Sequence, residues 1–106
     1  MSEGKVVAEK KSNLGRIIFD NVKKHNAMSK AMWDQLSEKM QLFDSDDEIR
    51  VVVLEGAGEK SFVSGADISK FESERSNLDS IKEYGVSVNC AYHSVQHALK
   101  PTIAKI

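Results

Sequence analysis

The sequence has 106 residues, the length of one small domain, and its apolar and charged contents of 41% and 29% are ordinary for a globular protein. The formal net charge of -1 leaves no excess positive charge for a phosphate backbone or an anionic membrane surface, so we expect neither nucleic acid nor membrane as a partner. No apolar run approaches the roughly 20 residues that span a bilayer, and the start of the chain lacks a hydrophobic signal core. We therefore expect a soluble, cytoplasmic protein.

Two short stretches rich in Val and Ile, residues 5–9 and 16–20, flank the turn-like residues 12–15 and predict a β-hairpin. After the polar residues 21–26, Ser29 is a good N-cap for a helix of about four turns. The apolar residues of this helix recur at helical spacing and are predicted to be core rather than ligand contacts, together with Trp33: Met28, Met32, Leu36, Met40 and Phe43.

A third strand is predicted over residues 49–54, which follow the acidic and solvated residues 44–48. Its apolar run over residues 51–54 is unbroken, and such a run is typical of a central parallel strand that is covered on both faces. The glycine-rich residues 56–61 and the following residues 62–68 predict a loop that leads into a short helical turn. We expect function to lie in this loop.

A second long helix is predicted over residues 78–99, where apolar side chains again repeat every three or four positions. Lys100 and Pro101 end it, and residues 102–106 begin a further strand. The lone Cys90 on this helix is predicted to be a small buried hydrophobe rather than a nucleophile. The order of elements predicts an α/β fold in which helices pack on a sheet. An apolar strand at the end of the chain indicates that part of the sheet is missing.

In order and spacing, several segments resemble the enoyl-CoA hydratase/isomerase (crotonase) superfamily, and together they cover nearly the whole chain. They are residues 15–21 (GRIIFDN), 24–29 (KHNAMS), 47–56 (DEIRVVVLEG), 62–68 (FVSGADI) and 100–104 (KPTIA). The resemblance implies the ClpP/crotonase spiral of ββα units, with residues 1–106 as its N-terminal part only. We expect the chain to stop before the second oxyanion-hole loop and before the acidic general acid/base residues of the family.

The resemblance also implies site residues. The N–H of Ala66 is expected to be the catalytic donor, one of two in an oxyanion hole that stabilises a thioester enolate. Backbone groups of the same loop are expected to hold coenzyme A, with further contacts from a preceding segment: Lys24, His25, Ala27, Ser64, Gly65, Ala66, Asp67 and Ile68. The implied partner is an acyl-CoA, whose CoA belongs to the substrate, with no separate cofactor. Family members are typically homotrimers or hexamers, which we expect of the full-length protein.

The chemistry of the glycine-rich loop fits this assignment on its own terms. Fixed backbone N–H donors stabilise an oxyanion without reorganising during the reaction, and Gly65 lets the backbone approach a ligand closely. A following short helix would direct its positive dipole end to the same oxygen. Asp67 is interpreted as a helix cap rather than a catalytic carboxylate. Lys24 and His25 fit a solvated loop about as well as a CoA contact.

The sequence departs from the family pattern at two points within the chain. Residues 20–22 read Asp-Asn-Val where the family commonly has Asn-Arg-Pro, and Ser64 stands where the family often has Ala. Phosphate binding by a P-loop is disfavoured, because Gly56 and Lys60 are too close together for that motif. His93 and His97 have a spacing compatible with zinc, but no suitable Glu follows His93, so we expect no metal site.

The preferred hypothesis is an acyl-CoA-binding enzyme of the enoyl-CoA hydratase/isomerase type, a lyase or isomerase in the full-length protein, of which this fragment alone is inactive. The alternative is a non-catalytic crotonase-like module for CoA binding or assembly. The choice among hydratase, isomerase, dehydratase and hydrolase depends on side chains that the fragment is not expected to contain.

Overall fold

The computed structural model of the chain describes residues 4–67 and 77–106. Strands β1 (Lys5–Lys11) and β2 (Leu14–Asp20) form an antiparallel hairpin. Its turn contains only two residues, and Ser12 adopts a φ of 58° there. The predicted hairpin is confirmed, although both strands run closer to the turn than the sequence indicated.

Helix α1 (Lys30–Asp44) begins where the sequence predicted it. The Ser29 side chain caps it by accepting a hydrogen bond from the Met32 N–H at 3.3 Å. The apolar stripe of the helix is buried against the sheet, as its spacing predicted: Met32, Leu36, Met40 and Phe43. Trp33 is only partly buried and packs at the margin of the core.

Strand β3 (Val51–Gly56) is parallel to β2, and β4 (Thr102–Lys105) is parallel to β3. The strand order is β1-β2-β3-β4, so β3 is the inner parallel strand that was predicted. Each parallel step needs a crossover connection, which α1 supplies between β2 and β3. Helix α3 (Leu78–Gln96) lies in the second crossover, between β3 and β4. The α/β prediction is confirmed.

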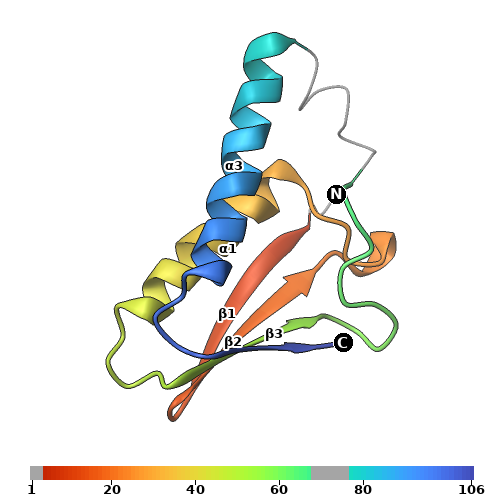
Figure 1. Ribbon diagram of the computed structural model, residues 1–106. Coiled ribbons are helices and arrows are strands. Elements are labelled where there is room, and N and C mark those ends of the chain that lie inside the picture. Colours follow the sequence, from red (N-terminus) through yellow and green to blue (C-terminus); the bar gives the residue numbers. More distant parts are fainter. Residues whose placement is uncertain (1–3, 68–76) are drawn as a thin grey trace.

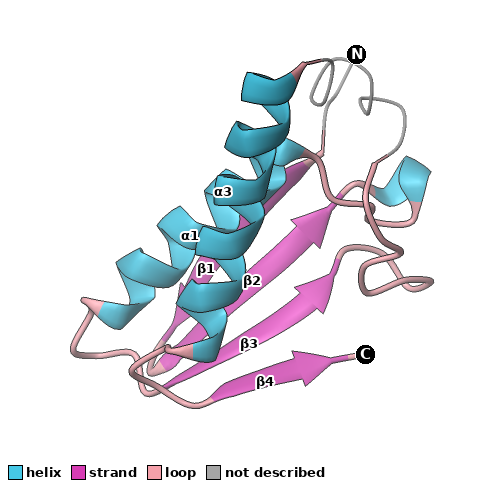
Figure 2. Ribbon diagram, turned by 45° about the horizontal axis from the view of Figure 1, so that its top comes forward, coloured by secondary structure: helices cyan, strands magenta, loops and turns pink. Residues whose placement is uncertain are grey.

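Both helices lie on the same side of the sheet (Figures 1 and 2). The residues of β3 that face the helices, Val52 and Leu54, are buried, whereas Val51 and Val53 on the other face are only partly so. The expectation that β3 is covered on both faces is therefore wrong for the described residues. On this opposite face, the Arg16 guanidinium pairs with the carboxylates of Glu9 and Glu55.

Helix α3 packs on α1 through a narrow stripe and projects beyond the sheet at its N-terminal end (Figure 1). Its N-cap is Asn77, whose side chain accepts from the Ser80 N–H at 2.8 Å. Only Ser87 and Ala91 of this helix are buried. Cys90 is consequently exposed, so its prediction as a buried hydrophobe is wrong. The helix ends at Gln96, before the Lys100 and Pro101 that were predicted to terminate it.

The core lies between α1 and the sheet and contains one residue of α3. Its buried members are Val6, Ile17, Phe19, Met28, Met32, Leu36, Met40, Phe43, Ile49, Val52, Leu54 and Ala91. Lys100 ties the segment before β4 to the end of α1, because its ammonium group donates to the carbonyl oxygens of Phe43 and Asp46. In the described part of the chain, neither helix is both long and apolar enough to cross a membrane.

Candidate functional site

The loops that follow β2 and β3 leave the same end of the sheet, because these strands are parallel and Phe19 lies opposite Gly56 at their ends. We call residues 21–29 the basic loop and residues 57–67 the glycine loop. They lie together beyond the arrowheads of β2 and β3 in Figure 2. In open α/β sheets, ligands bind outside the carboxyl ends of parallel strands. Both segments singled out from the sequence thus meet at one end of the sheet.

The basic loop opens with a single 3-10 turn, η1 (Val22–Lys24). The Asn21 carbonyl oxygen accepts from the N–H groups of Lys24 and Asn26, both at 2.9 Å. His25 and Asn26 then adopt left-handed φ values of 53° and 59°. Asn tolerates this conformation better than most residues, which is why the chain can reverse here. The side chains of Lys24 and His25 are left on the surface.

Asn26 is the most buried polar residue of the basic loop, at 1% exposure. Its side-chain oxygen accepts from the Asn21 N–H at 2.8 Å. Its side-chain nitrogen donates to the carbonyl oxygens of Ala57 and Ser61, at 3.0 and 2.8 Å. One buried amide therefore connects the start of the basic loop to the first half of the glycine loop.

The second half of the glycine loop pairs with the end of the basic loop as a short piece of sheet. Met28 and Ala66 form an isolated parallel bridge. The Met28 N–H donates to the Gly65 carbonyl at 2.7 Å, and the Asp67 N–H donates to the Met28 carbonyl at 2.8 Å. Met28 makes both hydrogen bonds of this bridge, one to each neighbour of Ala66. In a parallel bridge of this pattern, the N–H of the residue between those neighbours, Ala66, points away from the partner strand. The N–H of Ala66 has no acceptor among the described residues, and the residue is exposed.

Gly65 and Ser64 complete this arrangement. Gly65 has a φ of 137°, which L side chains rarely adopt, and a Cβ built there meets nothing within 4 Å. The Ser64 N–H donates to the His25 carbonyl, and its hydroxyl donates to the Lys24 carbonyl, both at 3.2 Å. The loop is anchored on one side and open on the other, next to Ala66.

The Asp67 carboxylate is turned inward, with its side chain only 4% exposed. The Lys24 ammonium group lies 3.3 and 3.4 Å from its two oxygens. The Asn21 amide, which also donates to the Ala27 carbonyl at 2.8 Å, lies 3.5 Å from it. These contacts add a fourth link between the two loops and favour a structural role for Asp67. The helical turn expected after it lies outside the described residues.

Of the residues expected to form a site, the structure brings together those of both loops. Lys24 and His25 are exposed, and Ala27 is buried beneath them. Ser64, Gly65 and Ala66 are exposed, and Asp67 is buried. Ile68 lies outside the described residues.

A pocket of about 320 Å³ lies between the two loops on the side of His25. Its exposed rim carries the charged side chains of Glu59 and Lys60 as well as the His25 imidazole. The floor includes the buried amide of Asn26. The pocket combines apolar surface from Val22 and Ala57 with charged groups of both signs at its rim.

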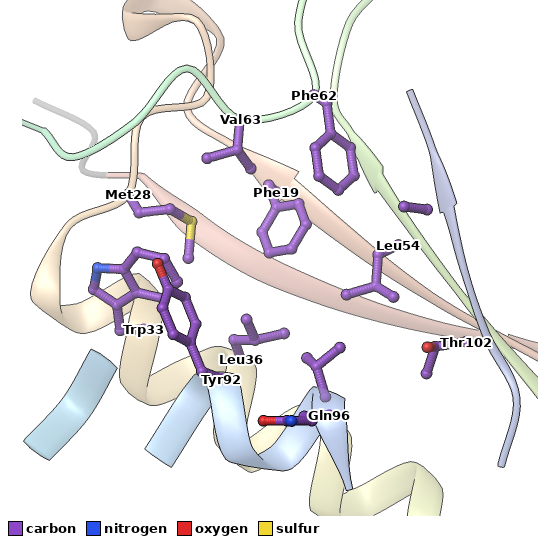
Figure 3. Close-up of a pocket in the computed structure, with 12 residues that line it drawn as sticks. Phe19, Met28, Trp33, Leu36, Leu54, Phe62, Val63, Tyr92, Gln96 and Thr102 are labelled. Carbon is purple, nitrogen blue, oxygen red and sulfur yellow. The ribbon is translucent and has the colours of Figure 1, made fainter. Parts of the chain in front are cut away.

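A larger hollow of about 590 Å³ lies between the sheet and the two helices, and its lining is almost entirely apolar (Figure 3). The Phe19 and Phe62 rings meet edge to face with centroids 5.5 Å apart. On the helix side, Trp33 and Tyr92 meet likewise at 5.4 Å. Val63 brings the glycine loop to the same hollow. An apolar ligand or an apolar segment of protein fits this lining.

The histidine pair considered from the sequence lies at the C-terminal end of α3. The rings of His93 and His97 stack with centroids 4.3 Å apart. Over residues 4–67 and 77–106, no further His, Cys, Asp or Glu joins them in a group that could hold a metal ion.

Clear pKa shifts occur away from the two loops, at the hairpin end of the sheet and on its open face. The Glu48 and Asp46 carboxylates raise the pKa of Lys10, and the Lys10 ammonium group lowers the pKa of Asp46. The hydrogen bond to Glu55 raises the pKa of Arg16. These shifts reflect structural ion pairs.

Sequence reasoning missed Asn21, Asn26 and Met28 as parts of the site. A sequence signal for Asn26 was available, because an Asn within a short polar stretch is a frequent occupant of left-handed backbone. The pairing of Met28 with Ala66 joins distant parts of the chain and has no local signal.

The Enoyl-CoA hydratase/isomerase family profile matches residues 9–106. Among curated proteins, the chain is 30% identical over its full length to the short-chain-enoyl-CoA hydratase of Clostridium acetobutylicum, of which it covers 40%. It is 31% identical to the carboxymethylproline synthase of Pectobacterium carotovorum, with 95% of the chain and 40% of that protein covered. The chain thus spans about 40% of the length of these relatives.

Solved structures agree with these matches. The crystal structure of an enoyl-CoA hydratase/carnithine racemase from Magnetospirillum magneticum superposes with a TM-score of 0.88 at 30% identity. The superposition covers 97% of this chain and 39% of that protein.

Proposed function

Because this chain belongs to the enoyl-CoA hydratase/isomerase family, we propose that its two loops bind an acyl-CoA and that the Ala66 N–H donates to the thioester oxygen. One observation carries the proposal. The bridge to Met28 anchors the neighbours of Ala66, while the Ala66 N–H itself has no acceptor among the described residues. A rigidly held donor at an exposed position is what an oxyanion site requires.

The chemical role follows from where charge develops. Attack on an acyl-CoA, or loss of a proton next to its carbonyl, places negative charge on the thioester oxygen. A donor that is already oriented stabilises this charge without reorganisation, and loss of one such donor costs on the order of 10² to 10³ in rate. Ala66 supplies a backbone donor, so a side-chain substitution there leaves the donor in place.

The CoA portion is assigned to the residues around Ala66. Lys24 presents a positive charge, and His25 presents its imidazole, at the surface of the basic loop. The exposed backbone of Ser64 and Gly65 offers close approach to the pantetheine arm, next to Ala27. Asp67 supports this surface through its contact with Lys24. Ile68 completes the proposed set by resemblance alone.

We further propose that the whole protein is a lyase or isomerase acting on acyl-CoA, without a cofactor beyond the CoA of its substrate. A second oxyanion donor and the acid/base groups are assigned to sequence outside these 106 residues. The chain alone then binds acyl-CoA without converting it. A trimeric or hexameric assembly and a cytoplasmic location are part of the same proposal for the whole protein.

Calorimetric titration of the 106-residue chain tests the binding proposal. Acetoacetyl-CoA is expected to bind more tightly than free CoA, because only the thioester presents an oxygen to Ala66. Equal affinity for both ligands would assign binding to the CoA portion alone and would contradict the role of Ala66. No binding to the folded chain would contradict the proposal for this chain.

A second candidate is a module that binds CoA or assembles with other subunits and does not catalyse a reaction. The observation in its favour is the outer edge of β4, which pairs only with β3 among the described residues and where every residue is exposed, including Ile103 at 54%. Exposed strand edges pair readily with other chains. Sedimentation of the chain with and without acetoacetyl-CoA tests the assembly form of this module, because a stable complex of the chain through β4 would favour it, whereas the enzyme proposal assigns assembly to the whole protein.

A further inference from the structure

The buried Asn26 side chain connects the basic loop to the glycine loop through hydrogen bonds. It is buried at 1% exposure, and it uses its oxygen and both amide hydrogens on backbone groups of residues 21, 57 and 61. A buried amide with all these bonds fixes the separation of the segments that it joins, because losing any partner leaves a desolvated polar group. It lies on the floor of the pocket beside His25, where these backbone groups hold its amide.

The glycine loop approaches the end of β3 so closely that Gly56 has no room for a side chain. A Cβ at Gly56 would lie 2.1 Å from the Ser61 carbonyl oxygen and 2.7 Å from the Asn26 amide nitrogen. The glycine loop therefore folds back on the end of β3, and the Asn26 side chain lies between these two segments. From Ser61, only a short span of loop leads to the bridge between Ala66 and Met28.

Asn26 also acts on the same bridge from the other side. It lies two positions before Met28, which is the bridge partner of Ala66. The left-handed φ of 59° at Asn26 sets the direction in which the basic loop enters this bridge. The orientation of the Ala66 N–H is thus constrained through both loops by one residue.

We propose that Asn26 is a positioning residue that sets the orientation of the Ala66 N–H and thereby the affinity for an acyl thioester. The ligand part of this inference rests on the proposed function, whereas the orientation part does not. The Asn26 amide directs two N–H donors at two carbonyl oxygens. Replacement of the amide by a carboxylate of the same shape should therefore turn these attractive contacts into repulsive ones.

Asn26→Asp and Asn26→Ala test the inference. The aspartate variant keeps the acceptor for Asn21 and tolerance of left-handed backbone, but it places oxygen against the carbonyls of Ala57 and Ser61. Acidification restores one donor by protonating the introduced carboxyl. Asn13→Ala is the matched control, because Asn13 makes a side-chain bond to the Glu48 carbonyl at the other end of β2.

The readout is the amide spectrum of the 15N-labelled chain, followed by titration with acetoacetyl-CoA. In both Asn26 variants, we expect a shifted Ala66 amide and faster exchange of the bridge amides of Met28 and Asp67. The Val52 and Ile17 amides should stay unchanged, and the Kd should rise about tenfold. Acid should partly reverse the Ala66 shift in Asn26→Asp, and Asn13→Ala should resemble the parent. An unmoved Ala66 amide in the Asn26 variants, or an equal shift in the control, would overturn the inference.

Two remaining outcomes are also decisive. If the parent chain does not bind acetoacetyl-CoA, the proposed function fails for this chain, and the Ala66 spectrum still decides whether Asn26 sets its orientation. If both Asn26 variants unfold, the inference is overturned, because Asn26 would then support the whole domain rather than the two loops.

Discussion

Met28 faces Ala66 across a single parallel β-bridge, in which the Met28 N–H donates to the Gly65 carbonyl at 2.7 Å. This pairing gives one part of the glycine loop a strand-like backbone and directs the Ala66 N–H, which has no acceptor in the described part of the chain, away from Met28. Met28 is also a core residue, at 1% exposure, so the bridge is rooted in the packed interior. The candidate donor is thus tied directly to the fold.

Gly65→Ala should weaken acyl-CoA binding at least tenfold and destabilise the chain by about 1–3 kcal/mol. The reason is backbone strain, because Gly65 has a φ of 137° and no atom lies near an added Cβ. Gly85→Ala is the matched control in α3 and should stabilise by about 0.5–1 kcal/mol. Urea unfolding and calorimetric titration measure both effects. Unaltered stability and affinity in Gly65→Ala would contradict the prediction.

Lys24→Met should destabilise the chain by about 1 kcal/mol, because it removes a cation from the buried Asp67 carboxylate. The small size reflects the 42% exposure of the Lys24 side chain. Addition of Asp67→Asn should recover part of the loss, since the carboxylate is then gone. A double-mutant cycle by urea unfolding gives the coupling, and strictly additive effects would show that the contact is energetically idle.

Met40→Ala should cost about 2–5 kcal/mol of unfolding free energy, because it opens a cavity at a fully buried position of α1. Leu42→Ala provides a control on the same helix, since Leu42 is 56% exposed and should change stability by less than about 0.5 kcal/mol. Thermal and urea unfolding both report the difference. Similar losses for the two variants would be inconsistent with the packing of α1 on the sheet.

The Lys10–Asp46 contact should make stability depend on pH in the acidic range. Lys10 lowers the pKa of Asp46 in the folded chain, so the stabilisation is complete above the pKa of the unfolded state, about 3.9. It is lost as pH falls through the lower folded-state pKa. The stability difference between the parent and Lys10→Met should therefore shrink between pH 7 and pH 2. Lys11→Met, at an exposed neighbour, should show no such trend.

The periodic elements were predictable because local rules and tertiary packing agree there. Ser29 caps α1 and its apolar stripe is buried, as the spacing indicated. The segments resembling the crotonase superfamily were also sufficient to predict the fold, which the superposition at a TM-score of 0.88 confirms. The exposure of Cys90 was missed, because α3 buries only a narrow stripe that its apolar pattern does not reveal.

The candidate site was predictable only in part. The glycine loop was found because its residue types have a chemical meaning on their own. Asn26 was missed, since its function lies in contacts to Ala57 and Ser61 that form only after the sheet brings the two loops together. The outward N–H of Ala66 likewise depends on pairing with Met28.

The most direct test of the role proposed for the Ala66 N–H is the amide spectrum of the 15N-labelled chain during titration with acetoacetyl-CoA and, separately, with free CoA. We expect a saturable downfield shift of the Ala66 amide proton with acetoacetyl-CoA only, while the Val52 amide in the core stays fixed. Binding of acetoacetyl-CoA that leaves the Ala66 amide unmoved, or that moves it no more than free CoA does, would contradict the claim that this N–H meets the thioester oxygen.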